Sequence, residues 1–258
     1  SIFAHSEAVQ NTAGAHPLGL ELQVMKQEVN RNAYNICRCY PRQSFMAGAY
    51  SFDNEVLGWS AMAAYMLEPA YRISNQFFFS MRASAGLAYA SHPYDASSNP
   101  TNQSYSTTIN AYLQYGLGLE WQMSQRTALQ ITGNFQHISN GGLKQPNKGV
   151  NWPTVGLHLL RFNRPRDLYR GSRQKDTTWR HLRWRKDIAV FGIGKRWAGE
   201  SNDGGSTRLP VFGVQAQIGK QVGGINQLTT GAEWSYDGTI DERLKADSLE
   251  GSPHKIAI

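Results

Sequence analysis

A long alternating segment, residues 104–123, reads S-Y-S-T-T-I-N-A-Y-L-Q-Y-G-L-G-L-E-W-Q-M. From residue 110 onward apolar and polar residues follow a period of two, the pattern of a β-strand with two different faces. The run is longer than the ~5–6 residues typical of strands in soluble proteins, and it suits a tilted strand that crosses a bilayer. One face holds Ala111, Leu113, Tyr115, Leu117, Leu119 and Trp121, and the other holds Asn110, Gln114, Gly116, Gly118, Glu120 and Gln122.

The same alternation recurs along most of the chain, clearest at 76–90, 208–221 and 225–237. It predicts one all-β domain over 1–258, an antiparallel up-and-down transmembrane β-barrel of about 12 strands whose C-terminus is truncated. A soluble β-sandwich or a lipocalin-like barrel is the alternative that we weigh against it. The strands that we expect are 18–28, 45–52, 56–67, 72–90, 104–123, 127–139, 150–162, 185–197, 208–221 and 225–237, with another opening at 254.

Composition narrows the class of protein. The 258 residues are 40% hydrophobic and 17% charged, and no stretch approaches the ~20 apolar residues of a membrane-spanning helix, which excludes a helical membrane protein. The net charge of +7 suits an anionic partner such as nucleic acid, acidic lipid or lipopolysaccharide phosphate. Ten Lys and Arg fall within 161–186, a segment that either binds such a partner or is a solvated loop. Cys37 and Cys39 look too close for a disulfide and too few for a zinc site.

One strand and the loop after it contain the candidate catalytic residues. On 127–139, His137 and Ser139 share the apolar face, with Cα atoms ~6.6 Å apart for an i, i+2 pair, so their side chains can form a hydrogen bond. A His that accepts a Ser hydroxyl proton activates this weak nucleophile, and polar residues on a lipid-facing surface are costly unless they are functional. Asn151, on the same face of the next strand, is placed to set the imidazole tautomer. Asn140, followed by Gly141 and Gly142, leaves the backbone free to aim N–H groups at an oxyanion.

The run His137-Ile138-Ser139-Asn140, followed by Gly142-Leu143-Lys144-Gln145-Pro146-Asn147 and by Gly149, resembles the lipid A 3-O-deacylase (PagL) family of outer-membrane β-barrel hydrolases. The resemblance implies an enlarged, acyloxyacyl hydrolase-like barrel in the outer membrane of a Gram-negative bacterium, which cleaves an ester-linked acyl chain from lipid A in lipopolysaccharide. It implies Ser139 as nucleophile, His137 as base, and Asn140 and Gly142 at the oxyanion. Pro146, Asn147 and Gly149 support the motif. No metal, cofactor or nucleic acid is implied, and the oligomeric state is left open.

The sequence departs from the family pattern at one position. Where the family has a Glu as the acid of its triad, this chain has Asn151, which can orient a His but cannot neutralise an imidazolium. Two other functions therefore stay open: a non-catalytic barrel with a structural, pore or scaffold role, and a soluble β-sheet protein that binds anionic polymers through 161–186. Near the N-terminus, His5 with Ser6 and Glu7 is a triad in composition only, because adjacent residues point apart, and we expect no site there. His158 is expected to face the interior.

Overall fold

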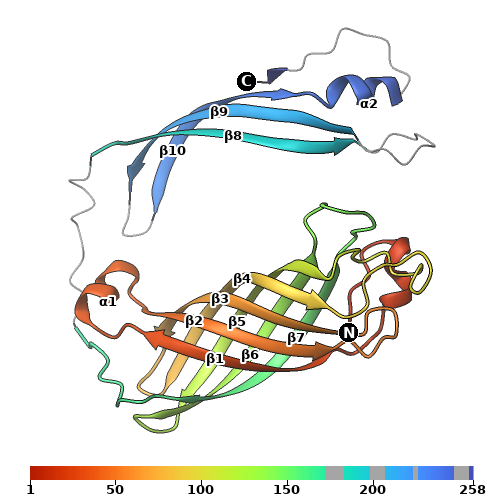
Figure 1. The fold of residues 1–258 in the computed structure, drawn as a ribbon. Helices are drawn as coiled ribbons and strands as arrows, with labels where there is room; N and C mark the ends of the chain where they lie inside the picture. The colour runs from red at the N-terminus through yellow and green to blue at the C-terminus, as the bar shows by residue number, and fades with distance from the viewer. Residues whose placement is uncertain (172–182, 198–206, 223–225, 247–255, 258) are drawn as a thin grey trace. The chain divides into compact units, whose positions relative to one another are not determined.

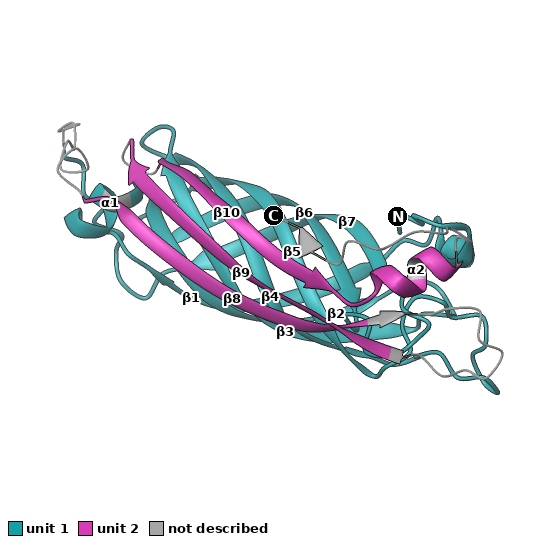
Figure 2. Ribbon diagram, turned by 90° about the horizontal axis from the view of Figure 1, so that it is seen from above, with its two compact units in different colours: residues 1–173 teal, residues 174–258 magenta. Residues whose placement is uncertain are grey.

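The computed structural model describes residues 1–171, 183–197, 207–222, 226–246 and 256–257. The chain divides into two compact units, Ser1–Arg173 and Gln174–Ile258, which Figure 2 shows in different colours. Within the described ranges, no helix is long and apolar enough to cross a membrane. The single domain over 1–258 stays a prediction.

The first unit is a seven-stranded antiparallel sheet in which each strand pairs with the next along the chain. Figure 1 shows the sheet curling around an interior. A short 3-10 helix (Glu7–Thr12) precedes the sheet, and the short helix α1 (Arg31–Cys37) follows its first strand. The strands are β1 (Leu18–Gln27), β2 (Tyr40–Ser51), β3 (Trp59–Arg72), β4 (Phe77–Ala90), β5 (Ile109–Gln122), β6 (Thr127–Ser139) and β7 (Val150–Arg161).

The second unit is a smaller antiparallel sheet with the order β11-β10-β9-β8. Its elements are β8 (Arg185–Trp197), β9 (Thr207–Gln221), β10 (Gln227–Asp237), the helix α2 (Ile240–Ala246) and β11 (Ile256–Ala257). The fold class is therefore all-β and antiparallel, as the alternation predicted. The pairing of each strand with its neighbour in a curled sheet is consistent with a β-barrel. The total of about 12 strands stays a prediction.

Exposure alternates along the strands of the first unit as the sequence indicates. On β5, Leu113 and Leu119 are 51% and 60% exposed, whereas Tyr112, Gln114 and Glu120 are buried. The apolar residues thus point outward and many polar residues point inward, the reverse of a soluble sheet with its apolar face in the core. An apolar outer surface around a polar interior is the arrangement of a membrane barrel.

A network of buried charges fills part of that interior. Arg42 from β2 pairs with Glu68 from β3 (Nη1–Oε1, 3.2 Å) and with Glu120 from β5. The Arg82 Nε lies 3.8 Å from Glu68 Oε2, and Arg166 Nη1 lies 2.7 Å from Glu120 Oε1. All five side chains are at most 3% exposed, so each charge depends on its partners rather than on water.

Arg166 is an exception to the solvated-loop interpretation of the basic segment 161–186, whereas Arg164, Arg183 and Lys186 are exposed. Its guanidinium is buried against Glu120 and lies over the rings of Phe78 and Phe162. The Glu120 carboxylate stabilises the buried Arg166 guanidinium. The run of basic residues around Arg166 in the sequence gives no sign of this ion pair. Arg173, Lys175 and Arg180 of the same segment lie outside the described residues.

The cysteine prediction was wrong, because Cys37 and Cys39 form a disulfide. The residue between them, Arg38, adopts the left-handed conformation (φ 55°) that ends α1. This turn leaves the two Cα atoms 5.1 Å apart, within the range that a disulfide spans. Sequence spacing alone did not reveal the turn.

Several strand bounds differ from the prediction, and two of the differences have a local reason. β4 begins at Phe77 rather than 72, because residues 73–76 form a turn in which the Ser74 hydroxyl accepts the N–H groups of Gln76 and Phe77. β5 begins at Ile109 rather than 104, because Tyr105 is buried and donates its hydroxyl to the Leu57 carbonyl. β2 begins earlier than expected, at Tyr40.

Candidate active site

Neighbouring strands bring three predicted residues into one hydrogen-bonded line. His137 on β6 is the register partner of Asn151 on β7, and Ser139 follows two residues later on β6. His137 Nδ1 lies 2.7 Å from Asn151 Oδ1, and His137 Nε2 lies 2.9 Å from Ser139 Oγ. With the Nδ1 proton donated to Asn151, Nε2 is left to accept the Ser139 hydroxyl. We call this line the Ser139–His137–Asn151 relay.

The relay lies on the outward face of the sheet. All three side chains are half-buried. The register partner of His137 on the other side is Leu113, and the residues that share the face of Asn151 along β7 include Val155 and Leu157, which are 85% and 69% exposed. The hydroxyl of Ser139 is therefore framed by the apolar outer surface and not by the polar interior.

Gly149 makes room for the imidazole. It adopts φ +76°, which side chains rarely allow, and a Cβ on it would lie 2.7 Å from His137 Cε1. The Gly149 N–H donates to the Ser104 carbonyl at 2.7 Å, which fixes the backbone beside the ring. A glycine at this position is thus a steric requirement of the relay.

The loop between β6 and β7 is organised by the buried side chain of Asn140. Its Oδ1 accepts the Gly142 N–H (2.9 Å), and its Nδ2 donates to the carbonyl of Lys144 (2.8 Å) and to Ser106 Oγ (3.2 Å). The Asn140 N–H donates to Asn147 Oδ1 at 2.9 Å. Pro146, the other residue of the motif, follows a cis peptide bond in this loop.

These bonds bear on the predicted oxyanion donors. The N–H groups of Asn140 and Gly142 donate within the loop, and the Asn140 amide donates to Lys144 in the loop and to Ser106 before β5, so an oxyanion would have to replace these acceptors. Their role at the oxyanion stays a prediction. In the structure they hold the shape of the loop that follows Ser139.

Sequence reasoning missed His5. Its Nδ1 lies 3.0 Å from Asn151 Nδ2, so the N-terminal segment contacts the Asn151 end of the relay. The Phe3 N–H also donates to the Asn151 carbonyl, at 2.9 Å. No local pattern indicates this contact, because 146 positions separate the two residues in the sequence.

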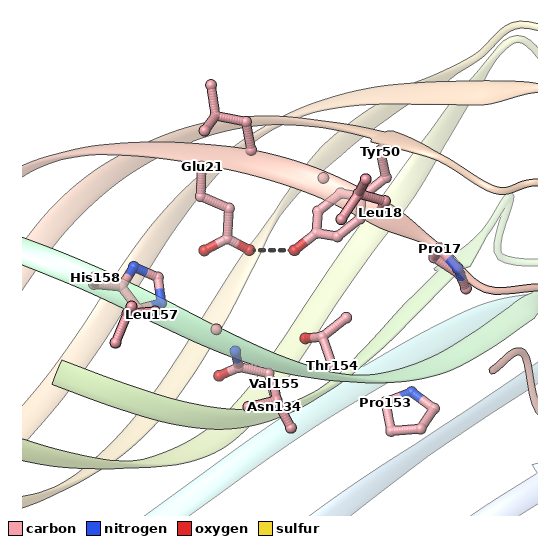
Figure 3. A pocket seen from close by; sticks show the side chains of 13 residues that line it. Pro17, Leu18, Glu21, Tyr50, Asn134, Pro153, Thr154, Val155, Leu157 and His158 are labelled. Carbon is pink, nitrogen blue, oxygen red and sulfur yellow. Dashed lines mark hydrogen bonds between the residues drawn. The ribbon is translucent and has the colours of Figure 1, made fainter.

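A separate polar cavity of about 310 Å³ lies inside the unit, between β1 and β7 (Figure 3). The Tyr50 hydroxyl donates to Glu21 Oε1 at 2.7 Å on one side of it, and His158 lies across from them. His158 is half-buried and bonds to Thr132 and Arg82, which agrees with its predicted inward direction. None of the relay residues lines this cavity.

Within the described residues, no group of three or more His, Cys, Asp or Glu is placed to hold a metal ion.

The strands and the relay together define a class of protein: an antiparallel barrel-type sheet with an apolar outer surface and a Ser-His pair on that surface. A comparison with protein families identifies the particular family. The model of the lipid A 3-O-deacylase (PagL) family matches residues 22–159, more than half of the chain, and the chain belongs to that family. Proteins of this family are outer-membrane β-barrel hydrolases that act on lipid A. No curated protein and no solved structure matches the chain.

Proposed function

We propose that this protein is an outer-membrane esterase that removes an ester-linked acyl chain from lipid A, with Ser139 as nucleophile, His137 as general base and Asn151 as the residue that orients His137. The observation that carries the proposal is the relay itself. Two hydrogen bonds, of 2.7 and 2.9 Å, leave the lone pair of Nε2 directed at the Ser139 hydroxyl. This is the arrangement that activates a serine for acyl transfer.

The reaction follows from these positions. Ser139 Oγ attacks the ester carbonyl while His137 Nε2 takes the hydroxyl proton, and the carbonyl oxygen becomes an oxyanion. The intermediate then collapses, the C–O bond to the lipid A sugar breaks, and the His137 proton passes to the departing alkoxide. A water molecule, deprotonated by His137, then attacks the Ser139 ester; the bond between the acyl carbon and Ser139 Oγ breaks, His137 returns the proton to Oγ, and a fatty acid is released. Asn151 keeps the Nδ1 proton in place in both halves.

The surface around the relay supports a substrate that approaches from within the membrane. Leu113 beside His137 is 51% exposed, and Leu143 in the loop after Ser139 is 67% exposed. Such side chains match an acyl chain better than a soluble ester. The Cys37–Cys39 disulfide agrees with an oxidising compartment such as the periplasm or the cell surface.

Mass spectrometry of lipid A tests the proposal in cells that express the wild type, Ser139→Ala or His137→Ala. We expect the wild type alone to remove one acyl chain. Ser84→Ala is a matched control, because Ser84 lies on the inner face and bonds to Gln114. If the folded, membrane-inserted wild type leaves lipid A intact and a fluorophosphonate probe does not label Ser139, the protein is a non-catalytic barrel instead.

A further inference from the structure

The two rims of the first unit differ in charge. At the rim that holds the relay, the connections 1–17, 52–58, 91–108 and 140–149 contain two lysines and four acidic residues, all exposed, and no arginine. The other rim is the one at which Figure 1 shows α1, at the far end of the sheet from the N-terminus. Its connections and strand ends carry six exposed arginines: Arg31, Arg38, Arg126, Arg161, Arg164 and Arg170. We call this the basic rim.

The segment 162–170, which follows β7, lies across the basic rim. Its Arg166 N–H donates to the Gln125 carbonyl at 3.0 Å, in the turn between β5 and β6. Its Tyr169 N–H donates to the Val29 carbonyl at 3.1 Å, in the connection after β1. A hollow of about 680 Å³ is lined by this segment and by both of these connections.

The lining of the hollow is mainly cationic. Arg31 and Arg170 line it from opposite connections, and both side chains are exposed. Asp167 is the one carboxylate among its lining residues. The other acidic residue of the described basic rim, Glu28, already pairs with Lys26 at 2.7 Å. An anion in the hollow would therefore meet more positive than negative charge.

The buried charges beside the hollow add to this excess. Arg166 also lines the hollow, and its side chain is 3% exposed. Arg166 shares the Glu120 carboxylate with Arg42, and Arg42 and Arg82 in turn share Glu68. Three arginines thus share two carboxylates, and Nε and Nη2 of Arg166 have no hydrogen-bond partner among the described residues. Water screens such buried charges less than it screens charges at the surface.

Apolar side chains lie directly beside the basic rim on the outer face. Met123, two positions before Gln125, is exposed, and so are Trp121 and its register partner Phe77. A guanidinium holds a phosphate through two parallel N–H bonds, whereas these side chains suit acyl chains. The two surfaces together fit an amphiphile with an anionic phosphate head and apolar tails.

We propose that this hollow binds the headgroup phosphate of an anionic phospholipid, with Arg31 and Arg170 in contact with the phosphate and the acyl chains along the apolar face beside Met123. The site lies at the opposite rim from the relay, so it is distinct from the site proposed for lipid A. It would fix the barrel in the leaflet on the basic side, because arginines near a membrane surface are attracted to anionic lipids. The inference does not depend on the proposed esterase function.

Calorimetric titration of the full chain in micelles of an uncharged detergent tests the proposal. The probes are a short-chain phosphatidylglycerol, a phosphatidylcholine with the same acyl chains, and inorganic phosphate. We expect phosphatidylglycerol to bind at least about tenfold more tightly than phosphatidylcholine, which carries no net charge. Inorganic phosphate should bind at least about tenfold more weakly than phosphatidylglycerol, because it has no acyl chains to bury.

Three double variants locate the site. In Arg31→Gln/Arg170→Gln we expect the affinity for phosphatidylglycerol to fall about tenfold or more, because both exposed guanidinium groups of the hollow are lost. Lys144→Gln/Lys148→Gln removes the same charge from the relay rim, and Arg126→Gln/Arg161→Gln removes it from the basic rim at positions that do not line the hollow. Salt at about 0.15 M screens exposed charges beyond about 8 Å, so both controls should stay within about threefold of wild type.

Circular dichroism verifies that every variant is folded. The inference is overturned if the wild type binds the two phospholipids equally, or if the hollow variant keeps the affinity of wild type. A loss in Arg126→Gln/Arg161→Gln as large as in the hollow variant would also overturn it, since the whole rim would then attract lipid without a defined site. If inorganic phosphate binds as tightly as phosphatidylglycerol, the hollow is a site for free phosphate and the proposed lipid is wrong.

Discussion

The outer and inner faces of the same sheet use polar residues in opposite ways. On the outer face, the relay consists of hydroxyl, imidazole and amide groups, each hydrogen-bonded to the next. On the inner face, Arg42, Glu68 and Glu120 are charged, and their side chains are at most 2% exposed. Charges on a lipid-facing surface are costly, whereas charges inside a barrel can be paired. Under the proposed function, the outer face carries the chemistry, whereas the ion pairs of the inner face stabilise the fold.

Glu120→Ala should have the largest effect on stability. It would leave Arg42 and Arg166 without their shared carboxylate, and breaking a buried ion pair costs about 3–5 kcal/mol. Urea titration in detergent, followed by tryptophan fluorescence, measures the free energy of unfolding. Glu28→Ala is the control, because the Lys26–Glu28 pair lies at the surface and contributes about 0–1 kcal/mol. Equal losses in the two variants would contradict the stabilising role of the interior network.

Gly149→Ala tests the outer face. The new Cβ would press on the His137 ring and the backbone would be strained at φ +76°, so we expect kcat to fall about 10–100-fold, since 1.4 kcal/mol of lost transition-state stabilisation is a factor of ten. Gly133→Ala is the matched control: Gly133 lies on the same face of β6, and a Cβ there meets nothing within 4 Å. If both variants retain full activity on lipid A, the ring does not require the space beside Gly149.

Gln136→Leu should have the smallest effect and sharpens the contrast between the faces. Gln136 precedes His137 but points inward, where its Oε1 accepts the Tyr112 hydroxyl and its Nε2 donates to Tyr50 Oη. The buried Tyr112 hydroxyl would lose its partner, at a cost of about 1–2 kcal/mol. The rate on lipid A per folded molecule should stay within about twofold of wild type, because no relay bond changes. A large loss of kcat without a loss of stability would show that the two faces are coupled.

Local pattern was enough to predict the part of the site that belongs to one hairpin. The period of two places His137 and Ser139 on one face, because side chains two positions apart on a strand point the same way. The strands β6 and β7 are consecutive and pair as antiparallel neighbours, and Asn151 near the start of β7 is the register partner of His137. The neighbouring alternation also predicted the apolar outer face of β5.

The remaining features depend on contacts between distant segments, which no local period records. His5 meets Asn151 where the N-terminal segment packs through Ile2 into a cluster of buried apolar side chains that includes Met46 and Phe52. Arg166 is buried only because Glu120 lies inside the curled sheet. Even the short Cys37–Cys39 link depends on the turn at Arg38. The order of residues thus specified the faces of the strands and the Ser-His pair. The tertiary structure determined the partners of those residues. The free energy of burial depends on the whole surface that is removed from water, and this surface comes from segments that are distant in the sequence.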